Sequence, residues 1–239
     1  MLKIEHLTKK YGDKIAVNDL NLQISKGDIY GFIGHNGAGK TTTIKAIVGI
    51  HDYDEGTILV DGISVKEHPL ECKNMIAYIP DNPDIFEYLT GIQYLNFTAD
   101  IYGVSKAERE QRISKYADLF EITKALGDLV SSYSHGMKQK LAIVSALIHN
   151  PKLIIMDEPF VGLDPKASIV LKKIMHEMCQ EGCAIFFSTH VLDVAEKLCN
   201  KIAIIKDGKL ISSGNIQDLV NGQTLEDVFM EVAQDVKTD

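Results

Sequence analysis

The residues of this chain with the clearest capacity for chemistry stand at positions 34–42, which read Gly-His-Asn-Gly-Ala-Gly-Lys-Thr-Thr. An apolar run at 29–33 precedes them, and a second apolar run at 44–50 follows. This order is typical of a strand, a glycine-rich turn and a helix N-terminus, which together bind phosphate. A flexible surface loop is the alternative interpretation, and it leaves the flanking strand and helix patterns unexplained.

Each residue type in this segment has a role in holding a phosphate. We expect Gly34, Gly37 and Gly39 to turn the backbone with positive φ, so that several N–H groups face one anion. Lys40 adds a full positive charge, and Thr41 offers a hydroxyl to a magnesium ion. The sequence therefore predicts a nucleotide-phosphate site formed by Gly34, His35, Asn36, Gly37, Ala38, Gly39, Lys40, Thr41 and Thr42.

A second candidate is the carboxylate pair Asp157 and Glu158, which ends the apolar run at 153–156. In a parallel sheet, ligands bind at the carboxyl ends of the strands. We expect Asp157 to hold magnesium, directly or through water, and Glu158 to orient or deprotonate an attacking water. Acidic pairs also end strands without any catalytic role, but the preceding phosphate loop favours the catalytic interpretation.

A third candidate is His190, which follows the apolar run at 184–187 through Ser188 and Thr189. From the carboxyl end of that predicted strand it could reach the γ-phosphate. Most histidines of the chain are expected to be structural or to face solvent, so this position alone does not settle a role. A phosphate loop by itself fits a kinase, a GTPase and many ATPases.

A parallel sheet would bring these candidates together. Apolar runs alternate with amphipathic helical patterns, which predicts an α/β fold with a parallel sheet covered on both faces. The predicted strands are residues 29–33, 75–79, 153–156, 184–187 and 202–205, and the predicted helices are 166–181 and 191–198.

The N-terminal part predicts a separate antiparallel arrangement. Residues 2–8 and 15–24 flank the turn signal Tyr11-Gly12-Asp13, and 57–60 adds a short strand after Asp54-Glu55-Gly56. At the other end, 209–212 can pair back after a tight turn. From residue 216 the pattern looks helical down to a polar tail.

The composition changes character between residues 85 and 150, where helical periodicity and many aromatic residues dominate. This stretch has the length of an inserted helical subdomain. We therefore expect one domain, with a nucleotide-binding core formed by 1–84 and 151–239 and a helical subdomain at 85–150.

The composition also limits the class of protein. A chain of 239 residues with 45% hydrophobic residues can bury a full core. No apolar run approaches the ~18 residues that a spanning helix needs, and the N-terminus lacks a signal core. We expect a cytoplasmic chain that reaches a membrane only through a partner. The formal net charge of −8 argues against a nucleic-acid partner.

The cysteines show no paired spacing and stand in apolar surroundings, which predicts reduced, buried thiols at Cys72, Cys179, Cys183 and Cys199. A zinc site formed by His176 with Cys179 and Cys183 is the alternative, but it lacks a fourth ligand.

After the phosphate loop come Ser134-His135-Gly136-Met137-Lys138, Asp157-Glu158, Gly162-Leu163-Asp164 and His190. In this order and spacing, the chain resembles the nucleotide-binding subunit of an ATP-binding cassette (ABC) transporter along essentially its whole length. The resemblance implies a P-loop NTPase (RecA-like) core, with an N-terminal antiparallel β subdomain, an inserted α-helical subdomain, and ATP and Mg²⁺ as cofactors. It also implies that Tyr11 stacks on adenine, although a plain turn residue fits that position as well.

The segment at Ser134 can also be interpreted physically. Ser134 is a good N-cap, and apolar residues follow it at helical spacing, so Ser134 and Gly136 stand at the positive end of a helix. In the family this end faces the γ-phosphate bound by the opposite subunit. The resemblance therefore implies that Ser134 and Gly136 bind ATP in trans, within a homodimer or a pair with a related ATPase. A capped helix without a ligand is the alternative.

Two positions depart from the family pattern. His135 stands where the usual signature has glycine, and Asp81 replaces the usual glutamine of the loop after 75–79. Asp81 could still contact magnesium or the attacking water, but its carboxylate adds negative charge near the phosphates. Asp81, the string at 134–140 and the tail at 225–230 together resemble ATPase subunits of the exporter type called ABC-2.

The resemblance implies two cassettes that close head to tail around two Mg-ATP and reopen after hydrolysis. Lys40 would stabilise the transition state, and His190 would sense the γ-phosphate. A separate integral membrane permease of the ABC-2 type would dock a short helix near residues 85–88 and hold the ATPase at the cytoplasmic face of the membrane. In that case Phe86 and Tyr88 would line the docking groove, whereas packing inside the subdomain is their alternative role.

Two other functions remain open from sequence. One is a soluble ABC-type ATPase that serves DNA repair, translation or cofactor assembly without a pore. The other is a small-molecule kinase, which leaves the segments at 134–136 and 162–164 unexplained.

Overall fold

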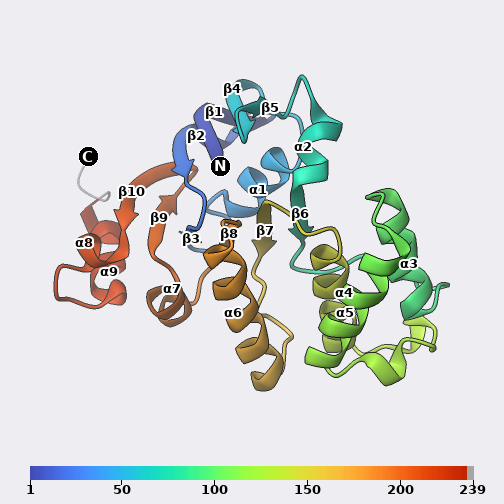
Figure 1. Ribbon diagram of the computed structural model, residues 1–239. Coiled ribbons are helices and arrows are strands. Elements are labelled where there is room, and N and C mark those ends of the chain that lie inside the picture. The colour runs from blue at the N-terminus through green and yellow to red at the C-terminus, as the bar shows by residue number, and fades with distance from the viewer. Residues whose placement is uncertain (236–239) are drawn as a thin grey trace.

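The computed structural model describes residues 1–235, and the strands of this part form two sheets (Figure 1). The larger sheet has six strands in the order β10 (Lys209–Asn215), β9 (Lys201–Lys206), β3 (Ile29–Ile33), β8 (Ala184–Thr189), β7 (Leu153–Asp157) and β6 (Ile76–Ile79). Its strands pair in parallel from β9 to β6, and β10 pairs antiparallel with β9. The predicted parallel sheet is confirmed.

The central strands are buried along their whole length because both faces of the sheet are covered. Ile154 and Met156 of β7 belong to a hydrophobic cluster on one face, and Leu153 and Ile155 belong to a cluster on the other. The first cluster includes α5 (His135–Leu147) and α6 (Pro165–Gln180), and the second includes α1 (Lys40–Ile47) and the smaller sheet. This alternation follows from the two-residue period of a strand.

The smaller sheet has four antiparallel strands in the order β2 (Lys14–Ile24), β1 (Leu2–Tyr11), β4 (Glu55–Val60) and β5 (Ile63–Ser64). It confirms the predicted antiparallel start and lies above the larger sheet in Figure 1. The turn is tighter than predicted, because Tyr11 still pairs with Lys14 and therefore ends β1. Likewise, Glu55 and Gly56 belong to β4 rather than to the preceding turn.

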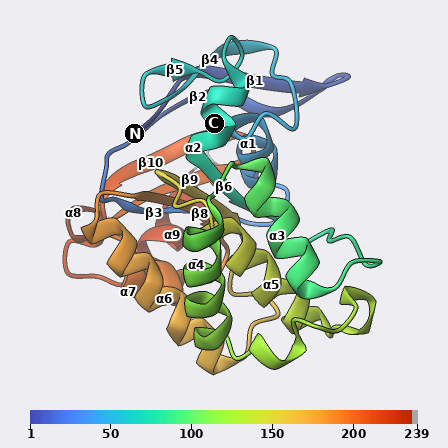
Figure 2. The same ribbon diagram turned by 45° about the vertical axis from the view of Figure 1, so that its right-hand side comes forward.

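The chain between β6 and β7 is mainly helical and contains α3 (Gly91–Ile101), α4 (Lys106–Leu119), two short 3₁₀ turns (Thr123–Ala125 and Val130–Ser132) and α5. Side chains fix where these helices begin. Thr90 with Gln93 and Ser105 with Glu108 form capping boxes at α3 and α4, and Ser134 caps α5. The three helices form a lobe at one side of the sheet (Figures 1 and 2).

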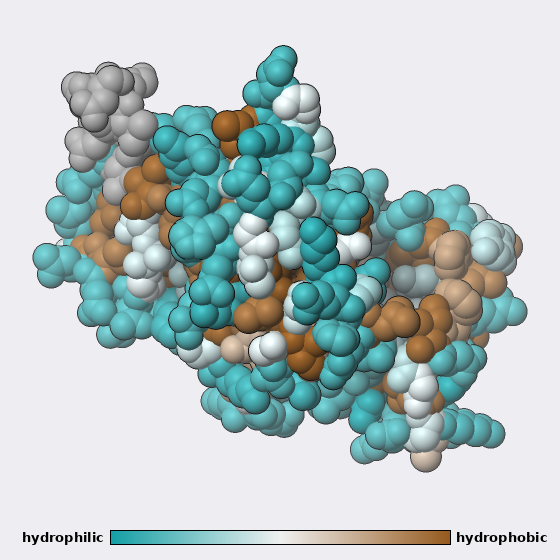
Figure 3. Space-filling model, turned by 90° about the horizontal axis from the view of Figure 1, so that it is seen from above, coloured by the Kyte–Doolittle hydropathy of each residue, from teal (hydrophilic) through white to brown (hydrophobic). Residues whose placement is uncertain are grey.

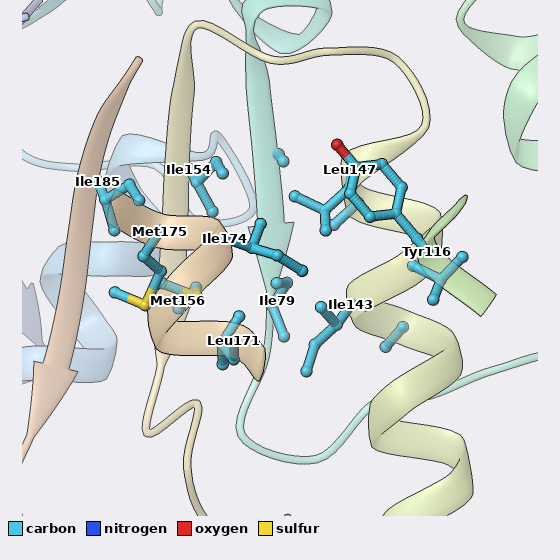
Figure 4. Packing of buried hydrophobic residues seen from close by; sticks show 14 of the residues in the cluster. Ile79, Tyr116, Ile143, Leu147, Ile154, Met156, Leu171, Ile174, Met175 and Ile185 are labelled. Atoms are coloured by element: carbon cyan, nitrogen blue, oxygen red, sulfur yellow. The ribbon is translucent and has the colours of Figure 1, made fainter. Parts of the chain in front are cut away.

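The lobe shares a hydrophobic core with the larger sheet. In Figure 4, Ile143 of α5, Leu171 and Ile174 of α6 and Ile79 of β6 point toward one another. Tyr116 of α4 joins the same cluster. A continuous core therefore connects the lobe to the strands that carry the candidate site.

The sequence missed α2 (Pro69–Met75), so Met75 ends a helix instead of beginning a strand. After α7 (Leu192–Leu198), the predicted C-terminal helix is in fact two helices, α8 (Ile216–Val220) and α9 (Leu225–Asp235). The break follows from left-handed backbone at Asn221 (φ 41°) and Gly222 (φ 89°). The predicted tail at 236–239 lies outside the described residues.

Within residues 1–235, none of the helices combines the length and the apolar character that crossing a bilayer requires. The four predicted thiols are buried and free of disulfides. Burial raises the pKa of Cys179 and of Cys183 to about 12, which keeps both protonated near neutral pH.

Candidate functional site

The predicted phosphate loop joins the end of β3 to the start of α1, as the sequence indicated. Gly37 (φ 83°) and Gly39 (φ 110°) have the expected positive φ. The same expectation for Gly34 is wrong, because its φ is not positive. Gly34 is needed for space instead, since a Cβ there would lie 2.5 Å from the carbonyl oxygen of Ile205. The loop is thus pressed against the neighbouring strand β9.

Lys40 is the first residue of α1, and its side chain is only 6% exposed. Its Nζ donates to the carbonyl oxygens of Gly34 (2.6 Å) and His35 (3.2 Å) and lies 3.7 Å from Oε1 of Glu158. Burial lowers the pKa of Lys40, while the charges of Glu158 and Asp157 act to raise it. The ammonium group is therefore held between the loop backbone and the carboxylates.

Asp157 ends β7 and is almost completely buried. Its Oδ2 accepts a hydrogen bond from Oγ1 of Thr41 (2.7 Å), and its Oδ1 accepts one from the hydroxyl of Ser188. A carboxylate and a hydroxyl in contact beside the phosphate loop are hard oxygen donors, which fit a Mg²⁺ ion. The structure thus brings together the two residues that the sequence assigned to magnesium.

Glu158 follows directly and has a left-handed backbone (φ 48°), which turns its side chain away from the line of the strand. Its N–H donates to Oγ of Ser188 (3.1 Å), and its Oε1 lies 3.0 Å from Nδ1 of His190. The side chain of Glu158 is 13% exposed, and that of His190 is 50% exposed. His190 therefore meets the candidate base directly and reaches it from the solvent side.

Asp81 reaches the same place from the loop after β6, because it lines one cavity with Lys40, Asp157 and Glu158. Burial raises the pKa of Asp81, and the charges of Asp157 and Glu158 add to that rise. The carboxyl groups of Asp81, Asp157 and Glu158 thus share one cavity with the buried ammonium group of Lys40.

The cavity has a volume of about 450 Å³ and extends from these carboxylates past the phosphate loop to Tyr11. The Tyr11 ring is 47% exposed and meets the ring of His51 edge to face, with 6.3 Å between centroids. An exposed ring at the far end of a phosphate cavity is suited to stacking on a base. Asn36, Gly37, Gly39, Thr41 and Thr42 also line the cavity, whereas Gly34, His35, Ala38 and His190 do not.

Ser134 and Gly136 are also absent from the lining of this cavity. The predicted cap is confirmed, because Oγ of Ser134 accepts the N–H of Met137 at 3.3 Å. The tip of α5 therefore presents a capped helix end that its own chain does not use at the cavity.

Several residues of the site were missed from sequence. The turn Asp207-Gly208 lines the cavity with Lys14. The N–H of Gly208 donates to the carbonyl of Ala38 (2.9 Å), and the carbonyl of Gly208 accepts from the N–H of Asn18 (2.8 Å). The turn signal was visible in sequence, but its pairing with the phosphate loop was not. Ser188 could have been found from sequence, because it is a polar residue that directly follows the apolar run at 184–187.

The sequence profile of the ABC transporter family matches residues 17–161 of this chain. The ABC-type transporter ATP-binding protein EcsA of Bacillus subtilis (strain 168) is 34% identical over 98% of this chain and 97% of its own length. The Nod factor export ATP-binding protein I of Cupriavidus pinatubonensis is 31% identical over 100% of this chain and 73% of its own length.

Solved structures agree with these sequence matches. The structure of an ATP-binding subunit of an ABC transporter has a TM-score of 0.95 and 34% identity, covering 98% of this chain and 100% of its own. A dimeric post-hydrolysis structure of the ATP-binding cassette MJ0796 with ADP and Pi has a TM-score of 0.79 and 25% identity, covering 90% and 99%. This chain belongs to the ABC transporter family, as an ATP-binding subunit with ATPase activity.

Proposed function

We propose that this ATPase drives export through a separate membrane permease, by closing with a second cassette around Mg-ATP and reopening after hydrolysis. The observation that carries the proposal is the arrangement of Glu158, which lies between Lys40 and His190 at the end of the nucleotide cavity. In this proposal the core comprises 1–84 and 151–239, and the helical subdomain comprises 85–150.

Within one chain, the phosphate loop binds the triphosphate through its N–H groups and through the ammonium group of Lys40. Thr41 and Asp157 would hold Mg²⁺, which when bound neutralises charge on the phosphate oxygens. Glu158 orients the attacking water and accepts its proton. His190, in contact with Glu158, fixes the direction of that carboxylate and responds to the γ-phosphate.

The second cassette supplies what the first lacks. The capped tip of α5, with Ser134 and Gly136, lies outside its own cavity and carries the partial positive charge of a helix N-terminus. Placed over the γ-phosphate of a partner cassette, this tip would bind ATP better than ADP, so that ATP favours the closed dimer. The dimeric form of MJ0796 supports such a pairing. Both a homodimer and a pair with a related ATPase are compatible with it.

An exposed aromatic patch supports a permease partner. We define this patch as Phe86, Tyr88 and Phe97, which are 45%, 73% and 45% exposed. The Phe86 ring lies 5.7 Å from both of the other rings, centroid to centroid. Figure 3 shows hydrophobic residues gathered at the surface of the lobe formed by α3, α4 and α5. Such a patch fits a short amphipathic helix of a membrane protein.

The patch is connected to the tip of α5. Glu87, between Phe86 and Tyr88, forms an ion pair with Lys138 of α5. The carbonyl of Glu87 also accepts the N–H of Ser131 (3.1 Å), just before the cap residue Ser134. A displacement of the patch would therefore move the α5 tip, which is what coupling between a permease and ATP requires.

The ABC-2 exporter type and a place at the cytoplasmic face of the membrane belong to the same proposal. The acidic residue Asp81, the segment at 134–140 and the name of the Nod factor export relative support it. The aromatic patch favours a transporter over the alternative, a soluble ABC-type ATPase without a permease, because a soluble ATPase would have no evident use for it.

The test compares the wild type with Glu158→Gln and with the matched control Glu177→Gln, an exposed glutamate of α6. Glu158→Gln should still bind ATP, lose about 10²–10⁴-fold in turnover, and accumulate as a dimer in size-exclusion chromatography with Mg-ATP. Glu177→Gln should behave as the wild type does. Wild-type turnover in Glu158→Gln would refute the assignment of the base, and a monomer under saturating Mg-ATP would refute the closed dimer.

A further inference from the structure

The first turn of α5 packs directly against the loop between β7 and α6. A Cβ atom on Gly162 of that loop would lie 2.7 Å from Cδ2 and 2.8 Å from Nε2 of the His135 ring. A Cβ on Gly136 would lie 3.0 Å from the carbonyl oxygen of Gly162. These separations leave no space for a larger residue at Gly162 while the imidazole of His135 stays in place.

A second connection lies further along the same helix. Nζ of Lys140 is 2.6 Å from Oδ2 of Asp164, and Oδ1 of Asp164 accepts the N–H of Ala167 (2.8 Å) as the N-cap of α6. The hydrogen bond from Lys140 lowers the pKa of Asp164, which keeps this carboxylate ionised. The loop is therefore attached to α5 at two points, by a ring contact and by an ion pair.

The other end of this loop carries Glu158. The N–H of Val161 donates to the carbonyl of Glu158 (3.1 Å), so the chain turns tightly between Glu158 and Gly162. A tight turn transmits a displacement better than an extended loop does, because it has few free dihedral angles. A shift of the α5 tip at Gly162 should therefore reach the backbone of Glu158.

We propose that His135 is a positioning residue that couples the two nucleotide sites of the dimer, by tying the ATP-capping tip of α5 to the Glu158 loop of the same chain. The inference rests on the proposed function, because only in a head-to-tail dimer do Ser134 and Glu158 of one chain serve different nucleotides. ATP bound under the tip would then align Glu158 for the other ATP. Two sites coupled in this way bind and hydrolyse ATP cooperatively.

The position of the ring relative to Asp81 supports this placement. His135 and His190 both oppose the rise in the pKa of Asp81 that burial and the neighbouring carboxylates cause. The imidazole of His135 is therefore close enough to Asp81 to affect its pKa, although His135 does not line the cavity of its own chain. His135 and Asp81 are also the two departures from the family pattern.

The experiment measures steady-state ATPase rates of the full chain over a range of Mg-ATP concentrations. The wild type should show a Hill coefficient clearly above 1 and approaching 2, the limit for two sites. His135→Ala should reduce the Hill coefficient to about 1 and should keep a melting temperature close to that of the wild type. His176→Ala, which removes an exposed histidine of α6, is the matched control and should keep the wild-type coefficient.

A double-mutant cycle tests the contact itself. Gly162→Ala should lower the maximal rate by about tenfold or more when His135 is present, since the new methyl group would overlap the ring. In the His135→Ala background the same change should cost clearly less, because only the backbone strain at φ 80° remains.

The outcomes separate the inference from the proposed function. A wild-type Hill coefficient of 1, an unchanged coefficient in His135→Ala, or additive effects in the cycle would each overturn the inference. If Glu158→Gln still forms its ATP-dependent dimer in those cases, the proposed function stands. If that dimer never forms, the proposed function falls and the coupling falls with it.

Discussion

Acidification should destabilise this protein through one partly buried imidazole, that of His149, two residues after the end of α5. The His149 ring stacks on Tyr102 with 3.8 Å between centroids and 7° between planes. Its Nε2 lies 3.2 Å from the carbonyl oxygen of Ile76, and its Nδ1 is buried without a hydrogen-bond partner. This geometry suits the neutral ring with its proton on Nε2, because a proton on Nδ1 would be buried and unpaired.

The magnitude follows from the pKa. Burial lowers the pKa of His149 from 6.5 to about 4, and the nearby charge of Arg112 acts in the same direction. At about 1.36 kcal/mol per pKa unit, this shift corresponds to about 3 kcal/mol. Below pH 6.5 the unfolded chain binds a proton at His149 and the folded chain does not. Stability from this group is therefore complete near pH 7 and is lost as the pH falls toward 4.

The assay is urea unfolding at a series of pH values between 7 and 4, for the wild type, His149→Gln and the control His176→Gln. The His149→Gln protein should start less stable, because the stacking on Tyr102 is lost, but its stability should fall by about 3 kcal/mol less over this range. His176→Gln should follow the wild type. Parallel curves for the wild type and His149→Gln would refute the reasoning, since some other group would then cause the acid sensitivity.

Three further predictions concern the site and its connections. Lys40→Ala should weaken binding of a fluorescent ATP analogue by about tenfold or more, because the ammonium group is the only charge that the loop offers to the phosphates within the described residues. Ser188→Ala removes a hydroxyl that bonds both Asp157 and the backbone of Glu158, and should lower the maximal ATPase rate by about 10–100-fold while the KM for ATP changes little. Lys138→Met breaks the ion pair with Glu87 and should leave the ATPase rate of the isolated chain near the wild-type value, whereas stimulation of ATP hydrolysis by the reconstituted permease should fall.

The sequence predicted the parts of the site that depend on local spacing. The phosphate loop, Asp157 and Glu158 could be placed because each follows an apolar run at the carboxyl end of a strand, and Ser134 could be recognised as a cap from its helix. Residues that depend on the register between distant strands could not be placed. Ser188 reaches Asp157 only because β7 and β8 pair with these two residues side by side.

Two details show where local interpretation fails. Gly34 is required by the approach of strand β9, and no pattern within the loop reveals that a carbonyl of Ile205 lies against it. The helix α2 was missed because its single buried residue, Cys72, gives no periodic apolar stripe. For Gly34 the deciding interaction is long-range, and a single sequence carries little trace of it.

The turn at Gly208 joins strand β2 to the phosphate loop through two backbone hydrogen bonds. These bonds fix the distance between the Tyr11 ring at one end of the cavity and the carboxylates of Asp157 and Glu158 at the other. A ligand that extends from Tyr11 to Glu158 can therefore contact both ends of the cavity at once. Nucleoside monophosphates should therefore bind near Tyr11 and compete weakly with ATP, without contacting Glu158.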